Sequence, residues 1–296
     1  MKNKLSGSIS LLLATIIWGA AFIAQSVGMD YIGPFTFQAV RCALAVVFLI
    51  PLVYLFEKDK KLCTVKWKNP KLWKTGFVCG IALFVAGGLQ QVGLIYTSAG
   101  KAGFLTAMYI VIVPILGLIF RQRPPFTAWI GVGLATVGLY LLSCAGVSEI
   151  NVGDLCVAGC AVAFAVQITL VDRMAADLDG LRLNCVQSLV CALLSAVVMG
   201  LTESPDMKNV LSCWLPLGYA GILSMGLAYS LQIIGQKHVA PTPASLIMSL
   251  ESVFAMLFGW LMLNERLTAT ELLGCVMVFA AVILSQIPTS KKKTHD

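Results

Sequence analysis

The stretch LIMSLESVFAMLFGWLML, residues 246–263, decides the fold of this chain. Every residue in it is apolar, small or hydroxylated, except Glu251. A helix needs about 20 such residues to cross the hydrocarbon core of a bilayer. We therefore predict a membrane-spanning helix here, and the single carboxylate inside it needs an explanation of its own.

The rest of the chain has the same character. Of its 296 residues, 58% are hydrophobic and only 12% are charged, whereas a soluble domain carries about 25% charged residues. The apolar runs predict ten spans, near 7–26, 35–56, 75–96, 101–120, 127–145, 153–171, 183–202, 214–235, 242–263 and 270–287. The loops between them are short except the second, so little mass is left for a soluble domain.

Lysines and arginines are divided unequally between the two sides of the predicted membrane. With a cytoplasmic N-terminus, 17 of the 21 lie on the cytoplasmic side, and only Lys101, Lys208 and Arg266 lie outside. The remaining one, Arg41, lies within a span. Because basic residues accumulate on the cytoplasmic side, we expect both termini in the cytoplasm and the protein in the plasma (inner) membrane.

The two halves of the chain resemble each other. A shift of 143 residues places RQRPPFTAWIG (121–131) on NERLTATELLG (264–274), so that Arg123, Thr127 and Gly131 match Arg266, Thr270 and Gly274. We divide the chain into a first half (1–146), a second half (147–288) and a cytoplasmic basic tail (289–296). Because each half has five spans, the second is inverted relative to the first. The predicted fold is an all-α integral membrane protein with ten transmembrane helices in two inverted five-helix repeats.

Four motifs are similar to those of EamA-type members of the drug/metabolite transporter superfamily: IIWGAAF (16–22), RCALAVVFLIPL (41–52), GLIYTSAGKAGFLTAMYIVIVPILG (93–117) and LESVFAMLFGWLMLNERLTATELLGCVMV (250–278). The resemblance covers essentially the whole chain. It implies carriage of small metabolites, often outward, through a central cavity lined mainly by spans 1, 3, 4, 6, 8 and 9. One position departs from the family pattern, because Ser252 follows Glu251 where the family often has proline. A straighter ninth helix is therefore one possibility.

Polar side chains inside spans normally face the bundle interior or a wet cavity. The candidates for the cavity wall, with aromatic residues that could contact an organic solute, are Trp18, Gln91, Thr106, Tyr109, Gln167, Tyr229 and Gln232. Adjacent residues on a helix cannot share a face, so at most one of Gln90 and Gln91 points into the cavity. Each of these polar residues could equally be a hydrogen-bond partner between helices.

Three charged residues are candidates for substrate or ion coupling: Arg41, Lys101 and Glu251. Arg41 is either a structural cation or an anchor for an anionic group of the substrate. Glu251 lies about 15 Å into its span, near the midplane, where a charge costs at least about 2.5 kcal/mol. It is either a latch, bonded to a hydroxyl, an amide or Arg41, or a protonatable gate element. The 143-residue shift places Met108 opposite it.

Several function classes have no support in the residues. The chain contains no GxxxxGK[ST] motif for ATP, no CxxC and only two histidines, His238 and His295, so we predict no cofactor and no metal site. A soluble basic module that could bind nucleic acid is also missing, and a membrane histidine or other acid–base pair for catalysis is not found. We do not expect an enzyme.

The sequence therefore predicts a secondary transporter that moves a small organic metabolite or amino-acid-like solute by alternating access. The family resemblance favours export, and the residue types do not decide between import and export. Proton coupling and simple facilitation both stay open, and nothing in the residues fixes the oligomeric state. The alternative is a non-transporting membrane scaffold or receptor. That alternative would be favoured if the polar residues were joined to one another with no cavity between the halves.

Overall fold

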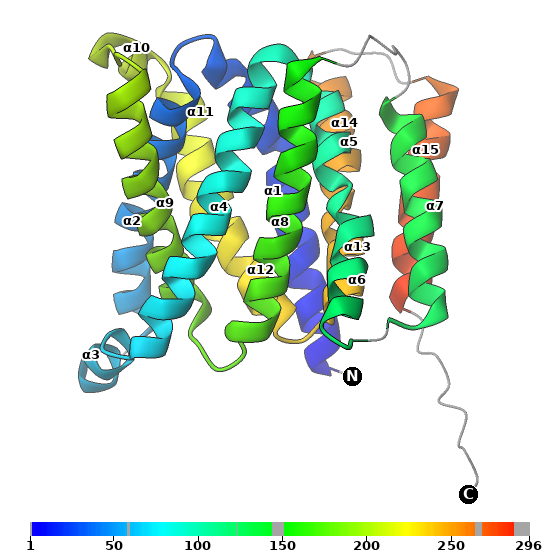
Figure 1. Cartoon of the computed structure of the whole chain (residues 1–296), viewed down its shortest axis with the longest axis horizontal. Coiled ribbons are helices and arrows are strands. Elements are labelled where there is room, and N and C mark those ends of the chain that lie inside the picture. The colour runs from blue at the N-terminus through cyan, green and yellow to red at the C-terminus, as the bar shows by residue number, and fades with distance from the viewer. Residues whose placement is uncertain (1, 58–59, 123, 144–150, 264–267, 287–296) are drawn as a thin grey trace, which may run out of the picture.

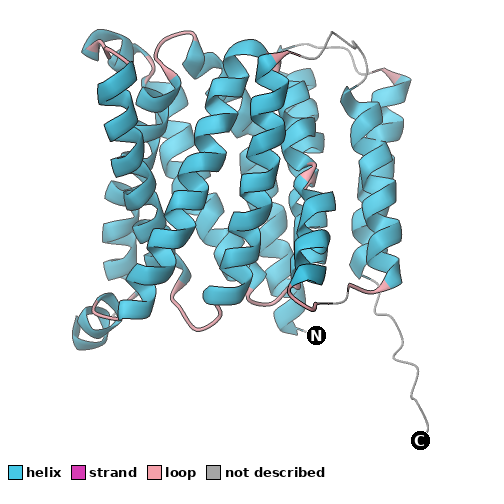
Figure 2. Ribbon diagram, in the orientation of Figure 1, coloured by secondary structure: helices cyan, strands magenta, loops and turns pink. Residues whose placement is uncertain are grey.

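The computed structural model describes residues 2–57, 60–122, 124–143, 151–263 and 268–286. All the regular structure in these ranges is helical (Figures 1 and 2). The first half contains α1 (Lys2–Met29), α2 (Pro34–Phe56), α3 (Lys60–Trp67), α4 (Pro70–Tyr96), α5 (Ala99–Ala107), α6 (Tyr109–Ile119) and α7 (Phe126–Ser143). The second half contains α8 (Val152–Met174), α9 (Gly180–Thr202), α10 (Met207–Ser212), α11 (Trp214–Gly218), the π-helix η1 (Tyr219–Ala228), α12 (Tyr229–Gln236), α13 (Pro241–Met248), α14 (Leu250–Leu263) and α15 (Ala269–Gln286).

The predicted spans are confirmed as helices of membrane-crossing composition. Within the described ranges, nine helical stretches are long and apolar enough to cross a bilayer, and Phe126–Leu142 adds a shorter apolar helix. Large apolar side chains stand on the outside of the bundle, as for Val47 (69% exposed) and Leu201 (81% exposed). Such exposure is expected where lipid replaces water as the solvent. The chain is therefore an all-helical, multi-pass integral membrane protein.

The helices run alternately up and down between two ends of the bundle (Figure 1). We call the end where α1 begins the lower face and the opposite end the upper face. The first span of the first half, α1, starts at the lower face, whereas its counterpart in the second half, α8, starts at the upper face. The halves are thus inverted relative to each other.

The packing between the halves follows this inversion. α4 of the first half packs on α8, and correspondingly α12 and η1 of the second half pack on α1. α5 and α6 contact α8 in the same way that α13 and α14 contact α1. The pairs α2–α9 and α7–α15 join equivalent helices directly. Helices of both halves therefore surround the same centre.

The fourth and ninth spans are each broken in the middle, which the sequence did not predict. α5 and α6 meet at Met108, and α13 and α14 meet at Ser249. At the first break the Val111 amide donates to the Met108 carbonyl, and at the second the Ser252 amide donates to the Ser249 carbonyl, so both turns tighten to a three-residue spacing. The ninth span is thus interrupted even though it has Ser252 where the family often has proline.

The two breaks have different local causes. In the ninth span the Ser249 hydroxyl donates to the Leu246 carbonyl at 2.8 Å, and serine hydroxyls bonded to the preceding turn bend helices. In the fourth span Pro114 lies inside α6. Proline removes the amide that would bond Ile110 and so weakens the helix just after the break. Proline and serine therefore give the two halves similar interruptions.

Some predicted features fall elsewhere than expected. α3 and α10 are short helices outside the predicted spans. α4 begins at Pro70, five residues before its predicted start, because Asn69 caps it by accepting from the Lys71 amide. The matched residues Arg123 and Arg266, the boundary at 146 and 147, and the tail 289–296 lie outside the described residues.

Candidate functional site

A cavity lies at the centre of the bundle, where the two halves meet. Its volume of about 40 Å³ is enough for about three water molecules. The wall is built by α1, α2, α4, α5 and α6 from the first half, and by α8, η1, α12, α13 and α14 from the second. It consists of Trp18, Phe22, Gln25, Arg41, Gln90, Thr106, Tyr109, Phe164, Ile168, Ser224, Tyr229, Gln232, Met248 and Glu251. An apolar and aromatic wall with a few polar groups is typical of small-molecule sites.

An aromatic pair from the two halves forms one side of the cavity. The rings of Trp18 and Tyr229 meet edge to face with their centroids 5.0 Å apart. Trp18 is positioned by the close crossing of α1 and α14, because a Cβ on the adjacent Gly19 would come within 2.8 Å of the Ala255 backbone nitrogen. Only glycine permits this approach. The Trp18 indole nitrogen is buried and has no hydrogen-bond partner.

Glu251 lines the cavity from α14 and is 6% exposed. The Tyr109 hydroxyl donates to Glu251 Oε1 at 3.0 Å, which joins the first turn of α14 to the first residue of α6. Tyr109 follows the first break directly, and Glu251 lies two residues after Ser249 at the second. A hydroxyl partner is one of those that the latch hypothesis named, whereas Arg41 forms no ion pair with Glu251 among the described residues.

Arg41 projects from α2 and is 4% exposed. Its Nη1 donates to Gln25 Oε1 of α1, and its Nη2 donates to Gln38 Oε1 at 2.9 Å. Gln38 Nε2 in turn donates to the Phe84 carbonyl of α4 at 3.1 Å. These residues, which we call the first-half cluster, join the first three spans. Arg41 Nε is buried without a partner.

Gln167 of α8 belongs to a similar arrangement in the other half. Its Nε2 donates to Gln187 Oε1 at 3.4 Å, and Gln187 Nε2 donates to Asn184 Oδ1 at 2.9 Å. Asn184 Nδ2 donates to the carbonyls of Met225 and Gly226 in η1, both at 2.8 Å. We call Gln167, Gln187 and Asn184 the second-half cluster; it joins α8, α9 and η1. Gln167 therefore lies behind the cavity wall.

The cavity and the second-half cluster are linked by Gln232. Its Nε2 donates to Gln167 Oε1 at 3.1 Å and to Gln236 Oε1 at 2.9 Å. Its own Oε1 is buried and has no partner. The amide is thus fixed on its donor side, and its acceptor oxygen has no partner.

The adjacent glutamines of α4 have different environments. Gln90 reaches the cavity and its Nε2 donates to Thr106 Oγ1 at 3.2 Å, so Thr106 also lies on the wall. Gln91 is fully buried outside the wall, with its Nε2 3.6 Å from Met29 Sδ. One glutamine of the pair faces the cavity, but it is Gln90 and not the predicted Gln91, because helix packing sets the rotation of α4.

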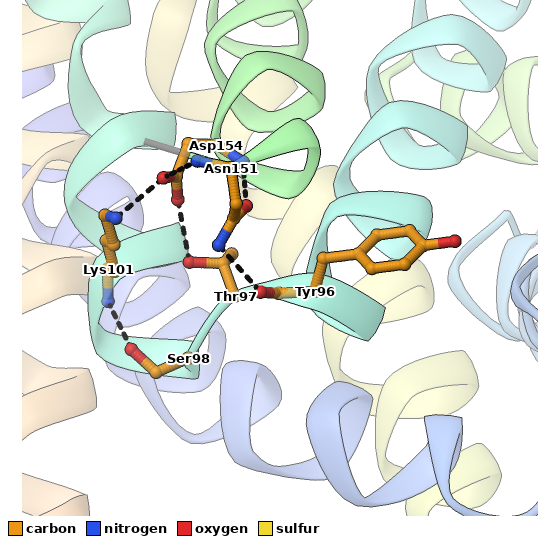
Figure 3. A network of polar contacts seen from close by, with 6 residues as sticks. All are labelled: Tyr96, Thr97, Ser98, Lys101, Asn151 and Asp154. Atoms are coloured by element: carbon orange, nitrogen blue, oxygen red, sulfur yellow. Dashed lines mark hydrogen bonds and ion pairs between the residues drawn. The ribbon is translucent and has the colours of Figure 1, made fainter. Parts of the chain in front are cut away.

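Lys101 is not among the residues that line the cavity. It lies in a polar network near the start of α5 and of α8 (Figure 3). Its Nζ is 2.6 Å from Asp154 Oδ2 at the start of α8. Asp154 also accepts from Thr97 Oγ1 at 2.9 Å, and Asn151 Nδ2 donates to the Tyr96 carbonyl at 2.9 Å. The network ties the loop between α4 and α5 to α8. This places Lys101 in a contact between the halves.

Charged groups also join the two halves at the lower face. Lys71 Nζ lies 2.6 Å from Asp177 Oδ2. This hydrogen bond with its positive charge lowers the pKa of Asp177 below its ordinary value. Arg173 stacks on the Phe120 ring at 3.8 Å and its Nη2 donates to the Phe120 carbonyl. Both contacts connect the first half to the second.

Comparison with known proteins agrees with this architecture. The model of the EamA-like transporter family matches residues 5–144 and 151–286. The chain belongs to the EamA-like transporter family. It is a membrane transporter, and its relatives are named as transporters and not as enzymes.

Family members with similar sequences extend over nearly the whole chain. An uncharacterized transporter of Archaeoglobus fulgidus is 32% identical over 95% of this chain and 86% of its own length. The threonine/homoserine exporter RhtA of Escherichia coli is 27% identical over 96% of this chain and 92% of its own. A solved crystal structure with 18% identity covers 95% of this chain and 96% of its own, with a TM-score of 0.79, and so shares the fold.

Of the seven residues predicted for the cavity wall, five line it, and so do two of the three charged candidates, Arg41 and Glu251. The structure brings together Trp18, Arg41, Thr106, Tyr109, Tyr229, Gln232 and Glu251, and it places Gln91, Gln167 and Lys101 outside. Sequence reasoning missed Phe22, Gln25, Gln90, Phe164, Ile168, Ser224 and Met248. A signal existed for two of them, because positions 18, 22 and 25 follow the i, i+4, i+7 spacing of one helix face.

Proposed function

We propose that this EamA-like protein exports a small amino-acid-like solute by alternating access, with the central cavity as its binding site. The observation that carries the proposal is the position of the cavity, between two inverted halves that each supply wall residues. In inverted-repeat transporters the substrate site lies near the midplane at the interface of the repeats. The polar residues thus converge on a cavity, and the condition that would have favoured a scaffold is not met.

The solute class is supported by size, chemistry and a relative. The cavity of about 40 Å³ favours a small solute, and side chains would have to move to admit it. Its wall offers an arginine, a glutamate and aromatic rings. The Escherichia coli relative is named as a threonine/homoserine exporter. These features together favour an amino-acid-like molecule and the outward direction.

The charge distribution supports the orientation. Most lysines and arginines fall on the side of the lower face, and such residues accumulate on the cytoplasmic side of bilayers. We therefore propose that the lower face is cytoplasmic, with both termini on that side, in the plasma (inner) membrane.

Purified full-length protein in liposomes tests the proposal. Vesicles loaded with radiolabelled L-threonine or L-homoserine should lose label faster than vesicles without protein. Excess unlabelled solute should slow this loss of label. Val47→Ala on the lipid-facing side of α2 is the matched control and should leave the rate unchanged. If the protein moves no compound of an amino-acid panel, with or without an imposed pH gradient, the result favours the scaffold alternative.

The same assay separates the two hypotheses for Glu251. Glu251→Gln keeps an oxygen that accepts the Tyr109 hydrogen bond but removes the titratable charge. If Glu251 is a latch, this variant keeps the pH dependence of transport and Tyr109→Phe loses rate. If Glu251 is a gate, the variant loses its response to a pH gradient while Tyr109→Phe keeps it.

A further inference from the structure

The two halves contain equivalent polar clusters that differ by one charge. Gln38 and Asn184 are 146 residues apart, as are Arg41 and Gln187. Gln38 and Asn184 each donate from their amide to a backbone carbonyl of the neighbouring span. Arg41 bonds the side-chain oxygen of Gln38 and also Gln25 of α1. In the same way, Gln187 bonds the side-chain oxygen of Asn184 and also Gln167 of α8. The neutral Gln187 therefore joins three spans in the way that Arg41 does.

It follows that the charge of Arg41 is not needed to join helices. A glutamine suffices for that purpose in the second half, where the cluster lies behind the cavity wall. The first-half cluster reaches the cavity through Gln25 and Arg41. The position with the added charge is thus the one that faces the cavity.

The guanidinium of Arg41 has no carboxylate partner in the part of the chain that the structure describes. The ion pairs formed there involve Lys66, Lys71, Lys101 and Arg182. Arg41 has two glutamine oxygens and the face of Phe37, with its carbon Cζ 5.7 Å from the ring centroid. A buried charge is costly unless it is paired with an opposite charge. The anion is therefore expected from outside the chain.

Two residues of the cavity wall each have a donor to spare for such an anion. Arg41 Nε and Trp18 Nε1 are both buried and without a hydrogen-bond partner, and both residues line the cavity. Charge-assisted hydrogen bonds to carboxylates are the ordinary use of a free guanidinium N–H. A single cation matches a single negative charge, and Glu251 in the same wall disfavours a dianion such as phosphate.

We propose that Arg41 selects substrates with a carboxylate group, which accepts from Arg41 Nε with Trp18 Nε1 as a second donor. This inference rests on the proposed function, because it assigns one end of the solute to one side of the cavity. On this inference Arg41 determines specificity. The other hydrogen bonds of the first-half cluster hold the helices together.

The test compares an acid with its matched amide in proteoliposomes. The wild-type protein should move L-threonine about tenfold faster than L-threoninamide, because the amide loses a charge-assisted hydrogen bond. Arg41→Gln installs the residue that the second half uses and should keep the fold, yet it should reduce L-threonine flux to the rate of the amide. Arg41→Lys keeps the charge and should retain part of the preference.

Gln187→Leu is the matched control at the equivalent position. It breaks the second-half cluster without removing a charge from the cavity, so it should lower thermal stability and leave the ratio of acid flux to amide flux unchanged. Equal wild-type rates for acid and amide, or an unchanged ratio in Arg41→Gln, would overturn the inference while the transport function stands.

A binding measurement separates failure of this inference from failure of the proposed solute class. If wild-type protein moves neither threonine compound, the melting temperature is measured with acetate, L-lactate and L-threonine against their amides. Stabilisation by an acid but not its amide, lost in Arg41→Gln, supports the inference without transport. Absence of any acid-specific stabilisation rejects it.

Discussion

Glu203 and Glu57 occupy the same place in the two halves but bind different groups. They are 146 residues apart, and each is the C-cap residue of its helix, α9 and α2 respectively. At the upper face, Glu203 accepts from the Phe35 and Thr36 amides at 2.8 and 2.9 Å and from the Thr36 hydroxyl at 2.6 Å. At the lower face, Glu57 Oε2 lies 2.5 Å from Lys66 Nζ and 3.7 Å from Arg182 Nη2.

The difference follows from how the opposite helix begins. α2 starts with Gly33 and Pro34 and has no capping side chain of its own, so its free amides need an acceptor. α9 starts after Asp179, whose side chain accepts from the Arg182 amide at 3.0 Å. Because α9 is already capped, Glu57 is available for basic side chains. One carboxylate position thus caps a helix from a distance at one face and forms ion pairs at the other.

The largest effect is expected from Glu203→Ala. It removes three hydrogen bonds to the positive end of a helix and should lower the free energy of unfolding by about 2 kcal/mol. Thermal unfolding of the purified protein in detergent measures the loss as a lower melting temperature. Glu203→Gln keeps one acceptor oxygen and should lose about half as much. A melting temperature equal to the wild type would show that α2 needs no cap.

A smaller effect, of opposite sign in two backgrounds, is expected from Gly33→Asp. In the wild type a Cβ at Gly33 would collide with the Glu203 carboxylate, so the substitution should destabilise. In the Glu203→Ala background that space is vacated, and the backbone of Gly33 (φ −64°, ψ 160°) suits a capping residue. Aspartate should there restore about 1 kcal/mol and make the start of α2 resemble that of α9.

A double-mutant cycle of these two changes checks the prediction by thermal unfolding. The two residues act on one site, so their effects should be strongly non-additive. Gly33→Ala in the same backgrounds is the control, since it adds the Cβ without an acceptor. Additive effects of Gly33→Asp and Glu203→Ala would contradict the idea that they cap the same amides.

The smallest effect is expected from Glu57→Gln. Arg182 keeps Asp179, whose Oδ2 lies 3.3 Å from Nη1, and the Lys66 side chain is 38% exposed. A partly exposed ion pair contributes about 0.5 kcal/mol and is screened by salt. The difference in melting temperature between wild type and variant should be smaller at high than at low ionic strength. A loss of stability as large as that of Glu203→Ala would refute the comparison.

The sequence predicts the fold well because membrane spans leave a strong signal. Runs such as 246–263 predict a helix from composition alone, and basic residues predict its direction. The breaks at Met108 and Ser249 give a weaker signal, since Pro114 is visible in the sequence but lies six residues after Met108, and the effect of Ser249 depends on a hydroxyl rotamer. Capping of α2 by Glu203 is also invisible, because the two residues lie far apart along the chain.

The cavity wall could be predicted only in part, for a similar reason. Residue type identifies that Arg41 or Glu251 is costly against lipid, but rotation of a helix decides which of Gln90 and Gln91 reaches the centre. Lys101 and Arg182 show the same limit. The sequence argument assigns each of them a side of the membrane, and Lys101 also a coupling role, whereas their partners Asp154 and Glu57 depend on the packing of the halves.

The π-helix η1 makes chain length, and not only residue type, a determinant of the cavity. The Tyr229 amide donates to the Ser224 carbonyl five residues back, so this segment holds one residue more than an α-helix would. Regular α-helical winding of this segment, with no residue removed, would turn everything after it by about 100°. Tyr229 and Gln232 would then leave the cavity together, so the wider winding of η1 keeps this part of the wall in place.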